Sequence, residues 1–139
     1  MSVESTKRIG NLDFEITVSG HQLIADVPAK LGGLNAGPSP HDYLQAALAT
    51  CTAITMQRYA NRKGIPLTSS DITVRIVREG PTNQLLREIK LFGELTEEQR
   101  NSLFAIAEKC PIQRFLERGA KIESHLLRVR PPAEPGLWL

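Results

Sequence analysis

The sequence is poor in several features that would assign a protein class directly. It has only two cysteines in 139 residues, 5% aromatic residues and a net charge of +2 spread along the chain. No uninterrupted apolar run approaches the roughly 20 residues of a membrane helix, and the N-terminal MSVESTKRIG lacks the apolar centre of a secretory signal. Because the basic residues form no cluster, no nucleic-acid footprint is present. We expect a cytoplasmic protein with neither a membrane nor nucleic acid as a partner.

The scarcity of cysteine and histidine limits the chemistry as well. Cysteines in a reducing compartment normally stay as thiols, so a permanent disulfide is disfavoured, while a transient one remains open. Two cysteines and three scattered histidines give no zinc-binding spacing. We therefore expect no metal site.

The amounts of the other residues are those of an ordinary globular protein, at 41% hydrophobic and 23% charged. A chain of this length fits one domain, which we expect to span residues 1–139. It can bury roughly two thirds of the surface that the unfolded chain exposes.

The first half predicts a hairpin, a loop and a long helix. Apolar residues alternate from Leu12 to Val18, break at Ser19 and Gly20, and resume to Val27, which is typical of strand, turn and strand. Residues 28–40 then concentrate glycine and proline in a loop. Ser39, with proline next and Asp42 three positions on, forms a capping box for a helix reaching about residue 64. We expect this helix to be central and packed on several sides.

The second half predicts a second hairpin over residues 71–95, with a turn at 80–83. A capping box at 96–99 opens another helix, which Pro111 interrupts. A short helix with Cys110 at or near its N-cap follows and stops at Gly119. Residues 120–129 are expected to form a final strand, and the proline-rich end beyond them no regular structure. The mixed order of elements indicates an α+β fold.

The two cysteines are the main candidates for chemistry. A thiol becomes reactive as the thiolate, which needs a nearby cation or a helix N-terminus. Cys110 has the second, whereas Cys51, about three turns inside its helix, needs a positive side chain. A buried cysteine acting as a small apolar residue is an equally good interpretation of the pattern. On facing helices, the two could form a transient bond if their Cα atoms come within about 7 Å.

His41 and Asp42 are weaker candidates. Capping explains Asp42 and solvent exposure explains His41. As catalytic residues, they would have to reach Cys51 across about two and a half helical turns. The threonines at 50, 52 and 55 are expected to bond back to the helix backbone.

The segment GPSPHDYLQAALATC, together with the later Cys110-Pro111, resembles the superfamily of osmotically inducible protein C and organic hydroperoxide resistance protein, OsmC/Ohr, and within it the YhfA-like branch. The likeness includes the glycine- and proline-rich loop, the Ser-Pro entry to a long helix and the strand order. It implies an OsmC-like fold: an intertwined homodimer with long helices packed back to back and active sites at the subunit interface.

The resemblance also implies a thiol peroxidase that reduces organic hydroperoxides and needs no cofactor. Cys51 matches the residue that attacks the peroxide and becomes a sulfenic acid. Cys110 matches the resolving cysteine that forms a disulfide with it, which a dithiol reductant reopens. The alternative is a small-molecule or lipid-binding protein of the same fold with inert thiols.

The sequence departs from the peroxidase pattern at two places. His41 stands where those enzymes have a glutamate, and Asp42, one position later, is the available substitute. They also pair an arginine of the N-terminal half with the thiolate, but this chain has none between Arg8 and Arg58. Lys30 and His21 are the cations left in that segment.

Overall fold

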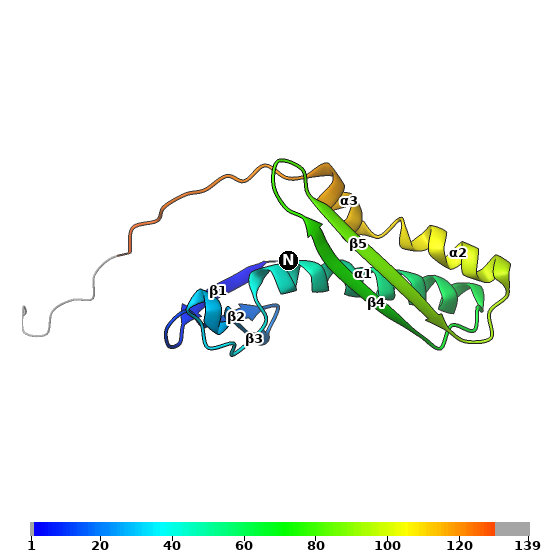
Figure 1. Ribbon diagram of the computed structural model, residues 1–139, viewed down its shortest axis with the longest axis horizontal. Coiled ribbons are helices and arrows are strands. Elements are labelled where there is room, and N and C mark those ends of the chain that lie inside the picture. Colours follow the sequence, from blue (N-terminus) through cyan, green and yellow to red (C-terminus); the bar gives the residue numbers. More distant parts are fainter. Residues whose placement is uncertain (1, 130–139) are drawn as a thin grey trace, which may run out of the picture.

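The computed structural model describes residues 2–129 as an elongated α+β chain with two separate sheets (Figure 1). The three-stranded sheet lies at the N-terminal end of a long helix, and the other elements lie along the rest of that helix. In chain order the elements are β1 Val3–Arg8, β2 Phe14–Val18, β3 His21–Ala25, the 3-10 turn η1 Ala29–Leu31, α1 Pro40–Lys63, β4 Ser69–Arg78, β5 Gln84–Phe92, α2 Glu97–Ala107 and α3 Pro111–Arg118.

The N-terminal sheet is antiparallel with the order β1-β2-β3. The predicted hairpin is confirmed as β2 and β3, joined through Ser19 and Gly20, whose φ angles of 49° and 78° suit the tight turn between twisted strands. Strand β1 was not predicted, because VESTKR has no apolar alternation. It forms by pairing its backbone with β2.

The glycine- and proline-rich loop is organised by the buried carboxylate of Asp26. It accepts hydrogen bonds from the backbone N–H groups of Val27 at 2.7 Å, Ala36 at 2.9 Å and Leu34 at 3.1 Å. The N–H of Ala36 is the main cause of its lowered pKa. Glycine is required at position 33, where a Cβ would lie 2.0 Å from the carbonyl oxygen of Val27. The loop therefore delivers the chain to the start of α1 in one defined path.

Helix α1 begins as the sequence predicts. The Ser39 hydroxyl accepts the N–H of Asp42 at 3.2 Å, and the Asp42 carboxylate accepts the N–H of Ser39 at 3.0 Å. The helix ends at Gly64, whose φ of 69° is favourable for glycine. The long central helix is thus confirmed over 24 residues.

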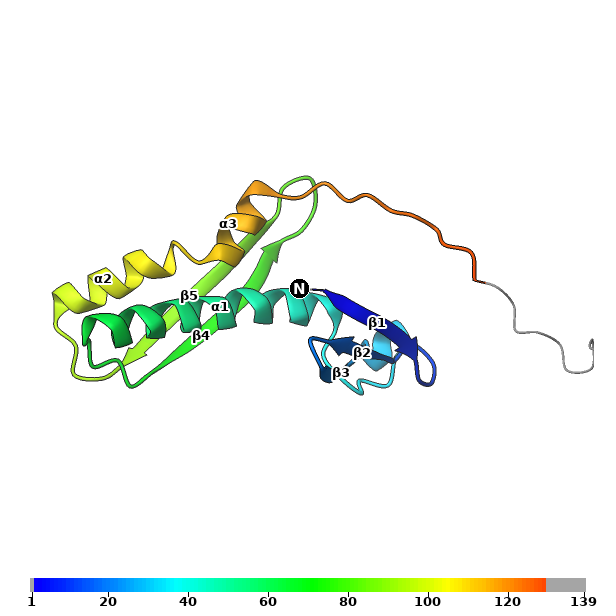
Figure 2. The ribbon, with the colours of Figure 1, turned by 180° about the vertical axis from the view of Figure 1, so that it is seen from behind.

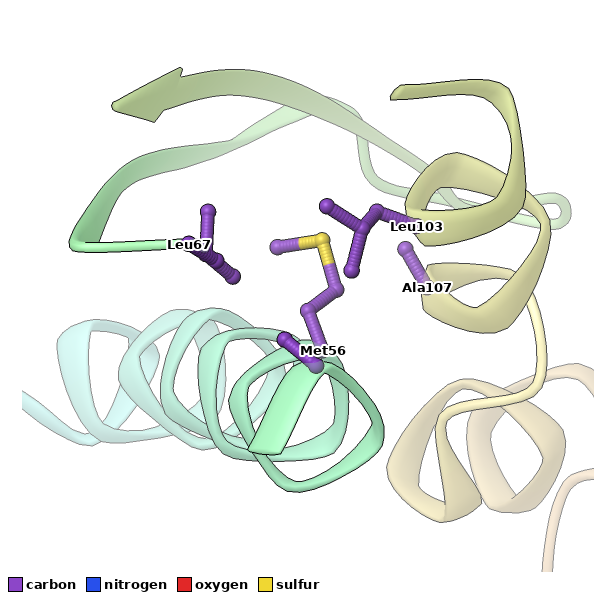
Figure 3. Packing of buried hydrophobic residues seen from close by; sticks show 5 residues of the cluster. Met56, Leu67, Leu103 and Ala107 are labelled. Atoms are coloured by element: carbon purple, nitrogen blue, oxygen red, sulfur yellow. The ribbon is translucent and has the colours of Figure 1, made fainter. Parts of the chain in front are cut away.

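The core lies where α1 and α2 pack on one face of the β4–β5 hairpin. Side chains alternate along both strands, half-buried toward the helices and exposed on the other face. Met56 of α1 points between Leu67, which lies just before β4, and Leu103, which lies on α2 (Figure 3). Ala60 and Ala107, both fully buried, complete this cluster.

Helix α2 ends before the proline, as predicted, and the chain turns at once into α3. Cys110 is the N-cap of α3 and Pro111 its first residue, where the missing N–H costs no helical hydrogen bond. Gly119 closes α3. The interrupted helix brings Cys110 to a corner between two elements that both pack against α1.

The predicted final strand over residues 120–129 is wrong. This segment has no regular structure and runs away from the rest of the chain (Figure 2). A strand needs a neighbour for its backbone hydrogen bonds, and within residues 2–129 this segment has none. Its apolar side chains are exposed, with Ile122 at 89% and Leu126 at 99%. The predicted irregular tail beyond it lies outside the described residues.

The expectation that α1 is packed on several sides holds for one side only. The face toward the hairpin and α2 is buried, but Ile54 on the opposite face is 59% exposed. Apolar residues of the N-terminal sheet, such as Leu23 and Ile24, are exposed as well. None of the described helices is both long and apolar enough to cross a membrane.

Leu103→Ala should lower the free energy of unfolding by about 2–5 kcal/mol, because the substitution leaves a cavity between α1, α2 and the hairpin. Urea unfolding followed by circular dichroism measures the change. Asn101→Ala, an exposed position on the same helix, is the control and should stay within about 0.5 kcal/mol of the original protein. Equal losses in both variants would contradict the position of the core.

Candidate functional site

The structure brings Cys51 and Cys110 together. Cys51 lies in the middle of α1 and is half-buried, while Cys110, at the junction of α2 and α3, is fully buried. Both are free thiols, and they lie close enough to affect each other's pKa. The pair that the sequence singled out therefore meets within one chain, across the contact between α1 and α3.

The environment of Cys51 disfavours its thiolate. Burial is the main cause that raises the pKa of Cys51, and the hydrogen bond to Cys110 raises it further. The backbone N–H of Ile112 and the hydroxyl of Thr55 lower the pKa of Cys51, but by less than the other effects raise it. The Thr55 oxygen lies 4.0 Å from the Cys51 sulfur. Within this chain, Cys51 holds its proton more firmly than an ordinary thiol.

The environment of Cys110 favours its thiolate. Burial, the largest single effect, would raise the pKa of Cys110, but hydrogen bonds together lower it below the ordinary value. They come from the Cys51 thiol, from the backbone N–H groups of Gln113 and Ile112 in the first turn of α3, and from Thr52. An anion at a helix N-terminus also gains from the helix dipole. The surroundings therefore lower the pKa of Cys110 although the side chain is buried.

A largely buried arginine bonds to residues of both helices. Arg87 of β5 has only 11% of its side chain exposed and donates a hydrogen bond from Nη1 to the Thr52 hydroxyl oxygen at 3.0 Å. It donates another from Nη2 to the Gln113 side-chain oxygen at 2.7 Å. Arg87 thus holds one residue from each of the two helices that carry the cysteines.

Glu108 completes the group around Arg87. Its Oε1 lies 3.4 Å from Nη2 of Arg87, and its Oε2 accepts a hydrogen bond from the Gln113 side-chain nitrogen at 3.0 Å. Glu108 is half-exposed, so water screens its charge more than it screens the charge of Arg87. The guanidinium therefore has three polar partners, Thr52, Gln113 and Glu108, which fix its position.

Arg87 was not predicted, because the family resemblance places the arginine that pairs with the thiolate in the N-terminal half. A signal was available: Leu85, Arg87, Ile89 and Leu91 share one parity along β5, which places an arginine in an otherwise apolar row. A charged residue at an inward strand position is uncommon unless it is paired. Thr50 and Thr52 do bond back to the helix backbone as predicted, and Thr52 also bonds Arg87.

The structure does not bring His41 or Asp42 to the thiols. Asp42 is the helix cap, and the backbone N–H of Ser39 is the main cause of its lowered pKa. The imidazole of His41 lies 2.8 Å from the Glu79 carboxylate at the surface. Asp42 is about 14 Å from Cys51 along the helix axis, at nine residues' distance.

The two cations considered from the sequence lie elsewhere. His21 is in β3 and Lys30 in the turn η1, both beside the N-terminal sheet. Among the described residues, neither makes a hydrogen bond or ion pair with a cysteine. The cation connected to the thiol pair is Arg87. No group of three potential metal ligands from histidine, cysteine, aspartate and glutamate occurs in residues 2–129.

A cavity of about 530 Å³ adjoins the Arg87 group. Arg87, Gln113 and Glu108 are part of its lining, and the apolar part comes from residues that include Leu48 and Phe104. The cavity therefore combines apolar side chains with Arg87 and with the carboxylates of Glu79, Glu108 and Glu117, and neither cysteine is part of its lining. A second cavity of about 440 Å³ lies at the start of α1, beside the capping box.

The comparisons with known proteins bear on the family and the fold. The family model of OsmC-like protein matches residues 32–125, which include both cysteines and Arg87. The chain belongs to the OsmC-like protein family. The family match does not resolve the YhfA-like branch, which stays a prediction. The comparison with curated proteins gives no significant match.

Solved structures of OsmC-like proteins share the fold. An OsmC-like protein from Mycoplasma pneumoniae is 18% identical with a TM-score of 0.64, covering 76% of this chain and 79% of that one. The organic hydroperoxide resistance protein OsmC from Legionella pneumophila is 22% identical with a TM-score of 0.56, covering 82% and 90%. An organic hydroperoxide resistance protein from Elizabethkingia anophelis is 18% identical with a TM-score of 0.59, covering 82% and 86%.

The role of Asp42 as a cap can be tested through pH. Its pKa is lowered in the folded protein, so it stabilises the fold above its unfolded pKa of about 3.9, and this contribution is lost as the pH falls through the folded pKa. Asp42→Asn should therefore show a shallower loss of unfolding free energy between about pH 5 and pH 3, measured by urea unfolding. Asp71→Asn, on the exposed face of β4, is the control. An unchanged pH dependence in Asp42→Asn would contradict the assignment.

Proposed function

We propose that this protein is a cysteine-based thiol peroxidase that reduces organic hydroperoxides. The observation that carries the proposal is the placement of two free thiols near each other, one in the middle of α1 and the other at the break between α2 and α3. The family membership supports it, since several solved structures of the same fold are of organic hydroperoxide resistance proteins. The proposed roles are those of attacking residue for Cys51 and resolving residue for Cys110.

The reaction needs two steps. The Cys51 sulfur attacks the outer oxygen of the peroxide, the O–O bond breaks, and Cys51 becomes a sulfenic acid while an alcohol leaves. Cys110 then attacks the sulfenic sulfur, forming a disulfide and releasing hydroxide or water. Cys51 is the better attacking residue because it is half-buried, whereas Cys110 is fully buried.

The substrate class follows from the surroundings of the pair. The cavity beside the Arg87 group is lined in part by apolar side chains such as Leu48 and Phe104, which favours hydroperoxides with hydrophobic chains over hydrogen peroxide. The disulfide must be reopened by a dithiol reductant, and such a cycle suits a reducing compartment such as the cytoplasm. No bound cofactor enters these steps.

A homodimer is the proposed working form. Ile54 on the outer face of α1, Leu23 and Ile24 on the N-terminal sheet, and Leu126 in the C-terminal segment are all exposed in the single chain. A second copy would bury these surfaces and give residues 120–129 a neighbour for their backbone. His41 and Asp42 remain candidate catalytic residues that could reach a thiol only from such a second copy.

Cys51→Ser should abolish peroxide consumption, because serine cannot form a sulfenic acid. Turnover of cumene hydroperoxide with a dithiol reductant measures this, and mass spectrometry after one equivalent of peroxide should show a Cys51–Cys110 bond in the original protein. Thr73→Ala, an exposed position on β4, is the control and should retain full activity. Peroxide turnover by Cys51→Ser at the original rate would contradict the proposal.

The alternative, a binding protein with inert thiols, predicts a different outcome of the same experiment. This alternative is supported by the raised pKa of Cys51. A protonated Cys51 attacks a peroxide slowly unless a base removes its proton. In that case both thiols would survive one equivalent of peroxide, and no disulfide would form.

Ile54→Glu should turn the dimer into a monomer, because the charge would be buried at the proposed contact. Light scattering coupled to size-exclusion chromatography gives the mass in solution. Thr73→Glu, an exposed position on β4, is the control and should remain dimeric. A monomeric original protein, or an Ile54→Glu variant that stays dimeric, would remove this surface from the interface.

A further inference from the structure

One side chain bonds to chain neighbours of both cysteines. Arg87 donates a hydrogen bond to the hydroxyl oxygen of Thr52, the residue next to Cys51 on α1. It also bonds the side chain of Gln113, in the first turn of α3, three residues after Cys110. These two bonds, at 3.0 Å and 2.7 Å, connect the helix of one thiol to the helix of the other. The spacing of the two thiols therefore depends on a residue that belongs to neither helix.

The same arginine also holds the break between α2 and α3. Glu108 is the C-cap of α2, two residues before Cys110, and its Oε1 lies 3.4 Å from Nη2 of Arg87. The Gln113 side chain donates to the other carboxylate oxygen of Glu108 at 3.0 Å while it accepts from Arg87. The three side chains thus form a closed ring of contacts at the helix break. Cys110 is consequently held from both sides along the chain.

Arg87 has a rigid base and little freedom of its own. It lies in the middle of β5 and pairs with Val74 of β4 in the antiparallel hairpin. Only 11% of its side chain is exposed, and its partner Thr52 is fully buried. A planar guanidinium presents several donors in fixed directions and can hold three partners at once, which a lysine ammonium on a flexible stem does less well. The hairpin is therefore the frame to which both cysteine-bearing helices are tied.

These ties matter for a disulfide because the bond forms only within a narrow range of distance and orientation between the two cysteines. Cys110 makes no side-chain capping bond of its own, so the contacts of its flanking residues fix the corner. Helices that are already held together avoid part of the entropy that closing the bond would otherwise cost. The ties thus raise the effective concentration of Cys110 toward Cys51.

We propose that Arg87 is a positioning residue that holds Cys110 within reach of Cys51 and thereby sets how readily the two form their disulfide. The inference rests on the proposed peroxidase function, in which this disulfide completes the cycle. It assigns Arg87 to the resolving step, after the peroxide has been consumed. It holds whichever group, in this chain or in a second copy, takes the proton from Cys51.

In the resolving step the Cys110 sulfur attacks the sulfenic sulfur of Cys51. An electron pair of the Cys110 sulfur forms the S–S bond, the S–O bond breaks, and the departing hydroxide leaves with the proton of Cys110 as water. The dithiol reductant later supplies two electrons and two protons, which regenerate both thiols. Arg87 takes part in no bond change and acts only through the position of the helices.

The positioning role is tested by equilibrating the full chain with mixtures of reduced and oxidised glutathione. In this exchange two protein thiols become a disulfide while oxidised glutathione is reduced to two thiols, so no peroxide is needed. Alkylation of the remaining thiols followed by mass spectrometry measures the oxidised fraction.

Arg87→Gln should lower the equilibrium constant for the Cys51–Cys110 disulfide about tenfold, which corresponds to a reduction potential about 30 mV less negative. The matched control is Arg75→Gln, because Arg75 lies on the exposed face of the same hairpin and pairs with Glu88 at 3.4 Å. Its equilibrium constant should equal that of the original protein.

Two further variants separate the bonds of the guanidinium from its charge. Arg87→Lys keeps the charge but loses the fixed donors, so it should also lower the equilibrium constant, and a constant at the original value would overturn the proposal. Gln113→Met removes the bonds to Arg87 and Glu108 at similar side-chain volume and should act in the same direction. Circular dichroism checks each fold, and Gln113→Met carries the test if Arg87→Gln does not fold. An unchanged or more stable disulfide in either folded variant would overturn the proposal.

The resolving step is tested directly by oxidising with cumene hydroperoxide in the presence of dimedone, which traps the Cys51 sulfenic acid before Cys110 reaches it. The fraction trapped as adduct, compared with the fraction recovered as disulfide, depends on the resolving step whatever the rate of the first attack. Arg87→Gln should increase the trapped fraction. Leu103→Ala, which weakens the core without removing a bond of Arg87, should keep the original fraction.

An equal increase in both variants would indicate a general loosening of the fold and overturn the role of Arg87, as would an unchanged fraction in Arg87→Gln. The two proposals fail separately, because the glutathione equilibrium uses no peroxide. A protein that consumes no peroxide but shows the Arg87 shift contradicts the proposed function alone. Peroxide turnover without that shift contradicts this inference alone.

Discussion

The thiol site depends on one buried cation. Arg87 enters from a strand, and its guanidinium joins α1 through Thr52 and α3 through Gln113. Removing a charged group from water is costly unless hydrogen bonds replace the lost solvation, and here a hydroxyl, an amide and a carboxylate supply them. Because these partners come from different elements, the same contacts that satisfy the arginine also fix the distance between the helices that carry the two sulfurs.

The helix break at Pro111 provides the other constraint. Had α2 continued, Cys110 would have been one more residue on a helical face, with its neighbouring amides engaged in the helix. The proline and the turn before it leave the first N–H groups of α3 without helical partners, at the end of the helix where Cys110 lies. Burial is the main cause that raises the pKa of Cys51, whereas at Cys110 hydrogen bonds outweigh burial and lower the pKa. Cys51 is the more exposed of the two thiols.

Much of this was predictable from the sequence, and the misses have physical reasons. The capping boxes at Ser39 and Thr96 and the Cys110-Pro111 break are local signals, and the structure confirms them. Arg87 was missed because its role depends on contacts between distant elements, although its inward parity on β5 was visible. Strand β1 and the segment 120–129 were misjudged because pairing between strands, and not local composition, decides whether an extended segment becomes a strand.

The position of Cys110 at the start of α3 links the redox state of the pair to local electrostatics. A thiolate there balances both the positive end of the helix and the guanidinium, whereas a disulfide carries no charge. Oxidation would thus leave Arg87 with Glu108 as its nearest counter-charge among the described residues. The electrostatic potential near Arg87 would then be more positive in the oxidised form. A reductant with an acidic surface would therefore bind the oxidised form more strongly than the reduced form.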